Sequence, residues 1–115
     1  MIKRGGQVSY EERGEALVIY IGGEIDHHSA VNVRTQIDAK ILEKRTARVL
    51  MELSAVEFMD SSGLGLIMGR LALVKKYGGE LCLLDPSAAV MRMVKLAGME
   101  RMVTILKSRE GKEDI

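Results

Sequence analysis

The sequence has 115 residues, of which 47% are hydrophobic and 3% aromatic, so we expect one domain with an aliphatic core. Its 17 basic and 16 acidic residues leave a net charge of +1, which gives no indication of a nucleic-acid partner or an anionic membrane surface. No apolar run reaches the roughly 18 residues that a membrane span needs, and the basic N-terminal residues are not followed by the apolar stretch of a signal peptide. Cys82 is the single cysteine, which excludes an internal disulfide and a thiolate metal cluster. We therefore expect a cytoplasmic protein.

Five strands are predicted from short runs that are β-branched, continuously apolar or alternating. They span Gln7–Glu12, Ala16–Ile21, Arg48–Leu53, Leu81–Leu84 and Val103–Lys107. The glycines Gly22-Gly23 are expected to end the second strand, and the polar residues Glu24–Ser29 to form a loop that leads into a helix.

Three helices are predicted from apolar residues at helical spacing. They cover Ala30 to about Lys44, Leu64–Tyr77, and a third segment that opens at Asp85-Pro86-Ser87 and ends at Gly98. The apolar faces expected in the first and third helices are Val33, Ile37 and Ile41, and Val90, Met93, Val94 and Ala97. The polar face of the first helix holds Arg34, Gln36, Asp38, Lys40 and Lys44.

Strands that alternate with helices indicate βα units and a mainly parallel sheet, which is an α/β fold of one domain. The domain is expected to fill residues 1–115, with its core over about 7–107 and a charged, frayed tail over 108–115.

The stretch from Phe58 to Gly65 (FMDSSGLG) lies between a predicted strand and a predicted helix. Asp60 is expected to cap that helix by accepting a hydrogen bond from a main-chain N–H of Ser62 or Gly63. Ser61 and Ser62 would then be held at a helix N-terminus, which suits a phosphate group. From local chemistry alone, a phosphorylation site and a purely structural capping pair are equally supported.

Two catalytic interpretations of this region fit less well. A hydrolase nucleophile requires Gly-x-Ser-x-Gly, but Met59 stands two residues before Ser61 and Asp60 two residues before Ser62. Asp26-His27-His28 together with Asp60 could suggest a metal site, yet no further histidine completes a ligand set. We expect instead that Asp26 or Ser29 caps the first helix, that the histidines lie on the surface, and that no metal is bound.

The motif Glu24-Ile25-Asp26-His27-His28, followed past a helix and a strand by Phe58–Gly65, resembles the STAS-domain anti-sigma factor antagonists. The resemblance covers most of the chain, including Gly78-Gly79-Glu80 before a strand and Leu96-Ala97-Gly98 at the end of the third helix. The double histidine is similar to the sporulation type, the anti-sigma F factor antagonists. Ile25 stands where leucine is more usual and Ser29 where threonine is.

The resemblance implies a βα superhelix with a small mixed, mainly parallel sheet and helices largely on one face. It implies a bacterial regulatory switch that acts in transcription regulation and is not an enzyme. The unphosphorylated form binds an anti-sigma factor and frees the sigma factor. The anti-sigma factor is also an ATP-dependent serine kinase, which phosphorylates the first serine of the motif, here Ser61, and a metal-dependent phosphatase reverses the reaction. The residues expected around the phosphorylated serine are Asp26, Asp60, Ser62 and Gly63.

The same resemblance implies that the protein holds no cofactor, because ATP and the divalent metal belong to the kinase and the phosphatase. We expect a monomer when the protein is alone. A stress-response sigma circuit remains an alternative to sporulation. So does a small nucleotide-binding or hydrolytic domain that uses Asp26, His27 and the serine turn.

A helical wheel of the second helix suggests where the partner binds. The face expected to cover the sheet is Leu64, Ile67, Met68, Leu71 and Val74. Leu66 and Leu73 lie off this face with Gly69 between them, and these three residues and His27 form the predicted partner surface. The alternative is that a neighbouring helix of the same domain covers both leucines.

Overall fold

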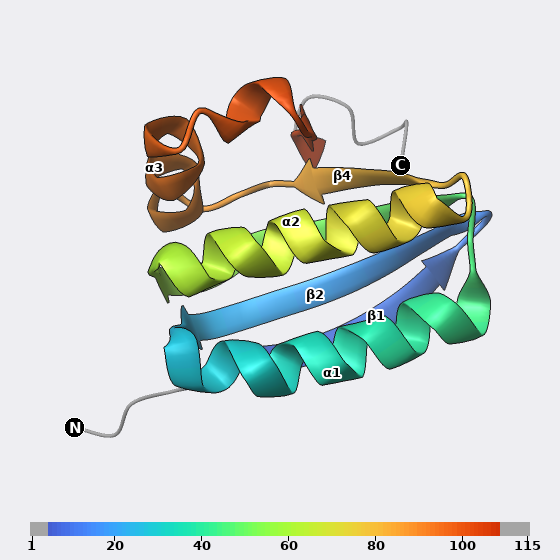
Figure 1. Ribbon diagram of the computed structural model, residues 1–115, viewed down its shortest axis with the longest axis horizontal. Coiled ribbons are helices and arrows are strands. Elements are labelled where there is room, and N and C mark those ends of the chain that lie inside the picture. Colours follow the sequence, from blue (N-terminus) through green and yellow to red (C-terminus); the bar gives the residue numbers. More distant parts are fainter. Residues whose placement is uncertain (1–4, 109–115) are drawn as a thin grey trace.

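The computed structural model describes residues 5–108, which form one five-stranded sheet and three α-helices (Figure 1). The strands are β1 (Gln7–Arg13), β2 (Ala16–Ile25), β3 (Arg48–Met59), β4 (Glu80–Leu84) and β5 (Thr104–Leu106). The helices are α1 (His27–Lys44), α2 (Ser61–Lys76) and α3 (Ala88–Leu96), with a 3₁₀ turn, η1 (Met99–Arg101), before β5. The strands lie in chain order; β1 is antiparallel to β2 and all other pairs are parallel. The predicted α/β fold with a mainly parallel sheet is confirmed.

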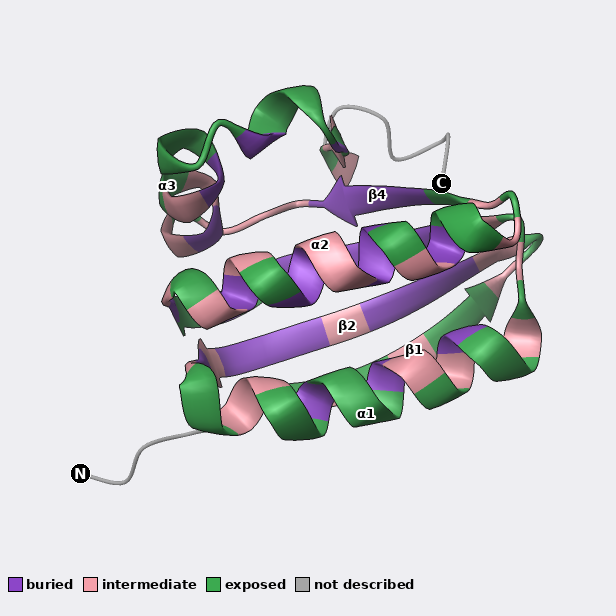
Figure 2. Cartoon of the chain, viewed as in Figure 1, coloured by how far each residue is buried: buried purple, intermediate pink, exposed green. Residues whose placement is uncertain are grey.

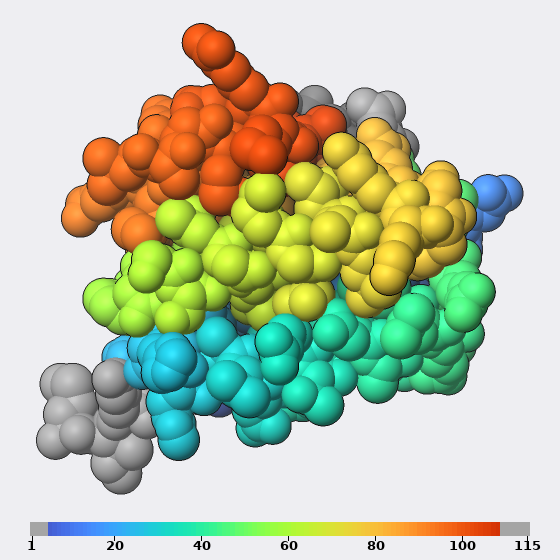
Figure 3. Space-filling model, viewed as in Figure 1, coloured from blue at the N-terminus to red at the C-terminus, as the bar shows by residue number. Residues whose placement is uncertain are grey.

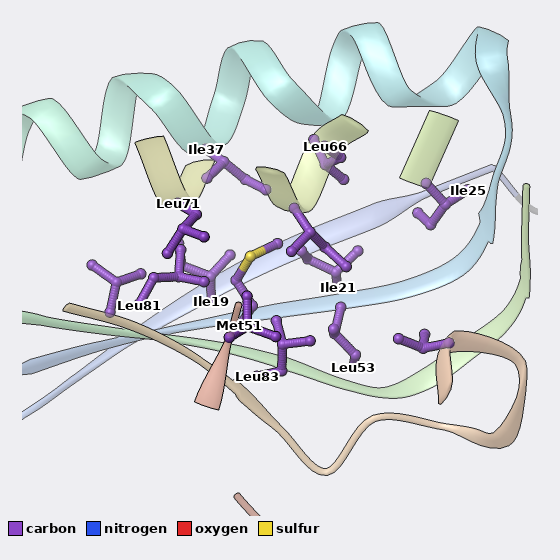
Figure 4. Packing of buried hydrophobic residues seen from close by; sticks show 14 of the residues in the cluster. Ile19, Ile21, Ile25, Ile37, Met51, Leu53, Leu66, Leu71, Leu81 and Leu83 are labelled. Atoms are coloured by element: carbon purple, nitrogen blue, oxygen red, sulfur yellow. The ribbon is translucent and has the colours of Figure 1, made fainter. Parts of the chain in front are cut away.

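The helices pack on one face of the sheet. Because alternate strand residues point to opposite sides, every second strand residue faces the helices. Leu17, Ile19 and Ile21 of β2 belong to the main core together with the buried residues of all three helices. Figure 4 shows part of this core lying between the sheet and the helices. Figure 2 shows that buried and exposed residues alternate along each helix. The intervening Val18 lies in a second, smaller cluster that contains no helix residue.

Two strands run further than the sequence indicates. β2 continues through Gly22-Gly23 to Ile25, and β3 continues to Met59. The two strands stay paired across register shifts around the glycines. A Cβ at Gly22 would lie 3.0 Å from the Cβ of Ala55, so the glycine permits close approach between strands. The prediction that Gly22-Gly23 ends the strand is therefore wrong.

The first helix begins earlier than predicted. The expected loop over Glu24–Ser29 is wrong, because α1 begins at His27 directly after the strand and residues 27–29 form its first turn. Helix α2 begins at Ser61, three residues before the apolar stretch that starts at Leu64, as the predicted cap at Asp60 requires.

The predicted buried face of α1 is confirmed, since Val33, Ile37 and Ile41 are its buried residues. In α3, Val90 and Val94 are buried, but Ala97 is exposed because it forms the C-terminal cap. The predicted tail lies outside the described residues except for Ser108, whose main-chain N–H donates to a carboxylate oxygen of Asp85 at 2.8 Å. Between residues 5 and 108, no helix is long and apolar enough to cross a membrane.

An ion pair joins α1 to α2. The Arg70 side chain on α2 is only 8% exposed, and its Nε lies 2.7 Å from an Asp38 carboxylate oxygen on α1. Burial lowers the pKa of Arg70, and the nearby Asp38 charge acts in the opposite direction. Asp38 therefore does not simply occupy the solvated face of α1; it neutralises a buried cation.

Replacing Asp38 by alanine should destabilise the protein, because Arg70 would stay buried without its counter-charge. We expect a loss of about 2 kcal/mol, below the 3–5 of a fully buried pair because Asp38 is partly exposed. Urea unfolding measures the change. The exposed Gln36→Ala variant on the same helix is the control and should stay within about 0.5 kcal/mol of wild type. An equally small change in Asp38→Ala would show that the pair contributes nothing.

Candidate functional site

The site lies where β2 and β3 end side by side. The parallel register pairs Ile25 with Met59, the last residues of the two strands. Asp60, which follows Met59, donates its main-chain N–H to the carbonyl of Ile25 at 3.2 Å. Each strand is followed by one aspartate and then a helix, so α1 and α2 begin at the same edge of the sheet (Figure 1).

Both aspartates cap their helices. The Asp26 carboxylate accepts from the Ser29 N–H at 2.9 Å, and the Asp26 N–H donates to the Ser29 hydroxyl at 3.1 Å. The Asp60 carboxylate accepts from the Ser62 N–H at 2.8 Å. The predicted cap at Asp60 is confirmed. At α1, Asp26 is the capping residue, and Ser29 completes a reciprocal capping box.

The two serines of the motif differ in accessibility. Ser61 is the first residue of α2 and is exposed, whereas Ser62 is half-buried and its N–H is held by Asp60. Neither α1 nor α2 has an acidic residue in its first turn. The positive ends of two helices therefore adjoin each other near the serines, a setting that favours negative charge.

Gly63 fixes how close the start of α2 lies to the end of β3. It is buried, and a Cβ built there would lie 2.3 Å from Cγ of Met59 and 2.6 Å from its sulfur. Met59 is itself 5% exposed and has little room to move away. A side chain at position 63 would therefore push the first turn of α2, which carries both serines, away from the sheet.

A groove runs between the N-terminal halves of α1 and α2. It has a volume of about 250 Å³ and is lined by His27, Ala30, Val31, Arg34, Ser62, Gly65 and Leu66. Figure 3 shows the two helices forming one continuous face. Sequence reasoning missed Val31 and Arg34 as site residues. They follow His27 at spacings of four and seven, so a wheel of α1 drawn from His27 would have grouped them.

The predicted partner surface is only partly accessible. Leu66 is 4% exposed and lies beneath α1 (Figure 4), so the prediction that it is a surface contact is wrong and the alternative of cover by a neighbouring helix holds. Leu73 is half-buried against the core. Gly69 is half-buried, with open space where a Cβ would stand. His27 is exposed and lies in the groove.

The remaining polar candidates are dispersed. His27 and His28 are both exposed in the first turn of α1. Over residues 5–108, no three His, Cys, Asp or Glu side chains come together as a metal site would require. The carboxylates of Asp26 and Asp60 each accept a main-chain hydrogen bond from their own helix.

Replacing Gly63 by alanine should cost about 1–3 kcal/mol, the usual range for overpacking a dense core, because the new methyl group clashes with Met59. Thermal or urea unfolding measures the loss. Gly65→Ala is the matched control on the same helix, since its Cβ meets nothing within 4 Å. That variant should be unchanged or up to about 1 kcal/mol more stable. Equal stability of the two variants would contradict the packing role of Gly63.

Comparison with known proteins identifies the family. A family model described as the STAS domain matches residues 7–111. The chain is 34% identical over 99 residues to the anti-sigma F factor antagonist of Paenibacillus polymyxa, covering 86% of this chain and 85% of that protein. It is 32% identical over 104 residues to the anti-sigma-B factor antagonist of Bacillus subtilis, covering 90% of this chain and 94% of that protein.

Two solved structures of proteins named SpoIIAA extend the comparison. The fold is similar to the anti-sigma factor antagonist SpoIIAA in its unphosphorylated form, with a TM-score of 0.75, 28% identity, and coverage of 93% of this chain and 94% of that one. It is also similar to Bacillus SpoIIAA in the phosphorylated form, with a TM-score of 0.69, 27% identity, and coverage of 93% and 97%. The chain belongs to the STAS domain family, among the anti-sigma factor antagonists of the SpoIIAA type.

Proposed function

We propose that this protein is a phosphorylation-controlled anti-sigma factor antagonist. Its unphosphorylated form binds an anti-sigma factor and so releases a sigma factor. The anti-sigma factor, acting as a serine kinase, phosphorylates Ser61 and ends the interaction, and a serine phosphatase restores the active form. The observation that carries this proposal is the exposed hydroxyl-bearing residue Ser61 at the first position of α2, at the helix terminus best suited to a phosphate.

The choice of Ser61 over Ser62 has a structural basis. Ser62 is half-buried, lines the groove, and has its main-chain N–H bound to the Asp60 carboxylate. Ser61 precedes it on the outside of the helix terminus, where a kinase can reach the hydroxyl without displacing the cap. Relatives named as antagonists of anti-sigma factors, and SpoIIAA structures described in phosphorylated and unphosphorylated forms, support control by phosphorylation, while the choice between the two serines rests on their accessibility.

The phosphate would meet two opposing electrostatic effects within this chain. It adds about −1.5 to −2 charges at neutral pH, which the Asp60 carboxylate repels. The N-terminal ends of α1 and α2 attract it, although each end already carries a capping carboxylate, that of Asp26 or Asp60. Because the effects oppose each other and Ser61 is exposed, the phosphate should change the surface offered to the partner more than the fold.

No cofactor of its own is needed for this role. ATP and the divalent metal would act in the kinase and the phosphatase, and this protein would be their protein substrate. We propose that it acts in the cytoplasm as a monomer, where its partners regulate transcription.

Two sigma factor circuits are candidates for this protein. The motif Asp26-His27-His28 favours the sporulation type, an anti-sigma F circuit. Matches to antagonists of both anti-sigma F and anti-sigma-B factors keep a stress-response circuit as the alternative. Binding assays of the unphosphorylated protein against purified anti-sigma F and anti-sigma-B factors separate the two, because the cognate factor should bind more tightly.

Substitution of the serines tests the proposal most simply. After incubation with ATP and the cognate anti-sigma factor, mass spectrometry should find one phosphate on the wild type and on Ser62→Ala, and none on Ser61→Ala. Ser61→Ala should still bind the anti-sigma factor. Ser61→Asp should bind the anti-sigma factor more weakly, because it adds negative charge at the helix terminus. The protein with ATP alone should remain unmodified and should not turn ATP over. Phosphate on Ser62 of the wild type would contradict the assignment.

The phosphorylated and unphosphorylated proteins should have nearly the same fold. Amide NMR spectra should differ only around residues 26–30 and 58–66, the segments at the helix N-termini. The unfolding midpoint in urea should shift little, because the attraction by the helix termini and the repulsion by Asp60 offset each other. Changes spread through β4 and α3 would instead mean that phosphorylation acts by refolding the domain.

A further inference from the structure

The groove between α1 and α2 has the size and shape of a docking site for protein side chains. Its volume of about 250 Å³ is below the roughly 300–1,000 Å³ of pockets that hold small molecules. Buried Leu66 and half-buried Ala30 line it, together with Val31, a residue that is 55% exposed. An exposed valine beside a partly apolar depression provides contact area that a docking segment would remove from water.

The charges at the groove favour an acidic occupant. His27 and Arg34 are the only ionisable residues among those that line it, and no carboxylate does. Arg34 is exposed, and within residues 5–108 it is engaged in no ion pair. Asp38, one turn further along α1, lies 2.7 Å from Arg70 and neutralises that buried cation instead.

Arg34 and Arg70 also repel each other. Burial is the main reason that the pKa of Arg70 is lowered, and the positive charge of Arg34 lowers it further. The group formed by Arg34, Asp38 and Arg70 thus holds two cations and one carboxylate, so one positive charge is in excess next to the groove. An incoming carboxylate would both pair with Arg34 and relieve this repulsion.

We propose that the groove binds a segment of the anti-sigma factor in which an apolar side chain stands next to an aspartate or glutamate. The apolar side chain packs on Val31 and Ala30 above the buried Leu66, and the carboxylate pairs with Arg34. This inference rests on the proposed function and names the contact through which binding is controlled. Ser62 lines the same groove and Ser61 adjoins it, so a phosphate on Ser61 would repel the partner's carboxylate and compete for Arg34.

The test compares variants of the unphosphorylated protein in binding to the purified anti-sigma factor that the wild type binds. Arg34→Ala should weaken binding about tenfold, as loss of a buried interface arginine commonly does, and Arg34→Lys should weaken it less. Val31→Asp, which places a negative charge in the groove without phosphorylation, should weaken binding by a similar factor. Arg92→Ala on α3 and Leu42→Asp on α1 are the matched controls at exposed positions and should stay within about twofold.

Two further measurements, the salt dependence of binding and the stability in urea, complete the test. Binding of the wild type should weaken as salt is raised, and this salt dependence should be smaller in Arg34→Ala. Arg34→Ala should unfold at the same urea concentration as the wild type or a higher one, because the repulsion of Arg70 is removed. If the wild type binds and is phosphorylated but Arg34→Ala and Val31→Asp bind within twofold of it, the groove is not the contact although the proposed function stands. If the wild type binds no anti-sigma factor, the proposed function itself fails and this inference fails with it.

Discussion

The parallel pairing of β2 with β3 up to their last residues is the constraint on which the site depends. Because Ile25 and Met59 are partners, the aspartates that follow them start two helices at the same edge of the sheet. The close approach of strands at Gly22 keeps the pair together across its register shifts. If β2 ended at Gly22-Gly23, the caps at Asp26 and Asp60 would not be held side by side, and the two helix termini would not adjoin.

The same frame explains why a charge at Ser61 can act locally. Behind the first turn of α2, Gly63 lies tightly against Met59, and further along the helix Arg70 is paired with Asp38 of α1. These contacts, with Leu66 buried beneath α1, hold the two helices as one unit. On a rigid support of this kind, an added charge should cause little rearrangement of the core. The effect of a phosphate is therefore concentrated on the surface that the partner would contact.

Much of this arrangement could be predicted from the sequence because it follows from local patterns. The spacing of Val33, Ile37 and Ile41 gave the buried face of α1, and the position of Asp60 after an apolar run gave the cap of α2. The lengths of β2 and β3 could not be predicted, because Gly22-Gly23 usually marks a turn, and only the neighbouring Ala55 makes it a site of close strand approach. Leu66 was misplaced for a related reason. A helical wheel shows one packing partner, the sheet, whereas α2 also packs against α1, which covers Leu66. The long-range pairing of Asp38 with Arg70 leaves no signal in a single helix. For that reason the sequence could not indicate that Arg34 has no ion-pair partner within residues 5–108.

We propose that the adjoining N-terminal ends of α1 and α2 form the functional surface. Hydrogen–deuterium exchange of the unphosphorylated protein, with and without its anti-sigma factor, can locate this surface. Binding should slow exchange in residues 27–34 and 60–66 and leave α3 and β5 unchanged. Protection of α3 or β5, with exchange in 27–34 and 60–66 unaltered, would contradict the proposal.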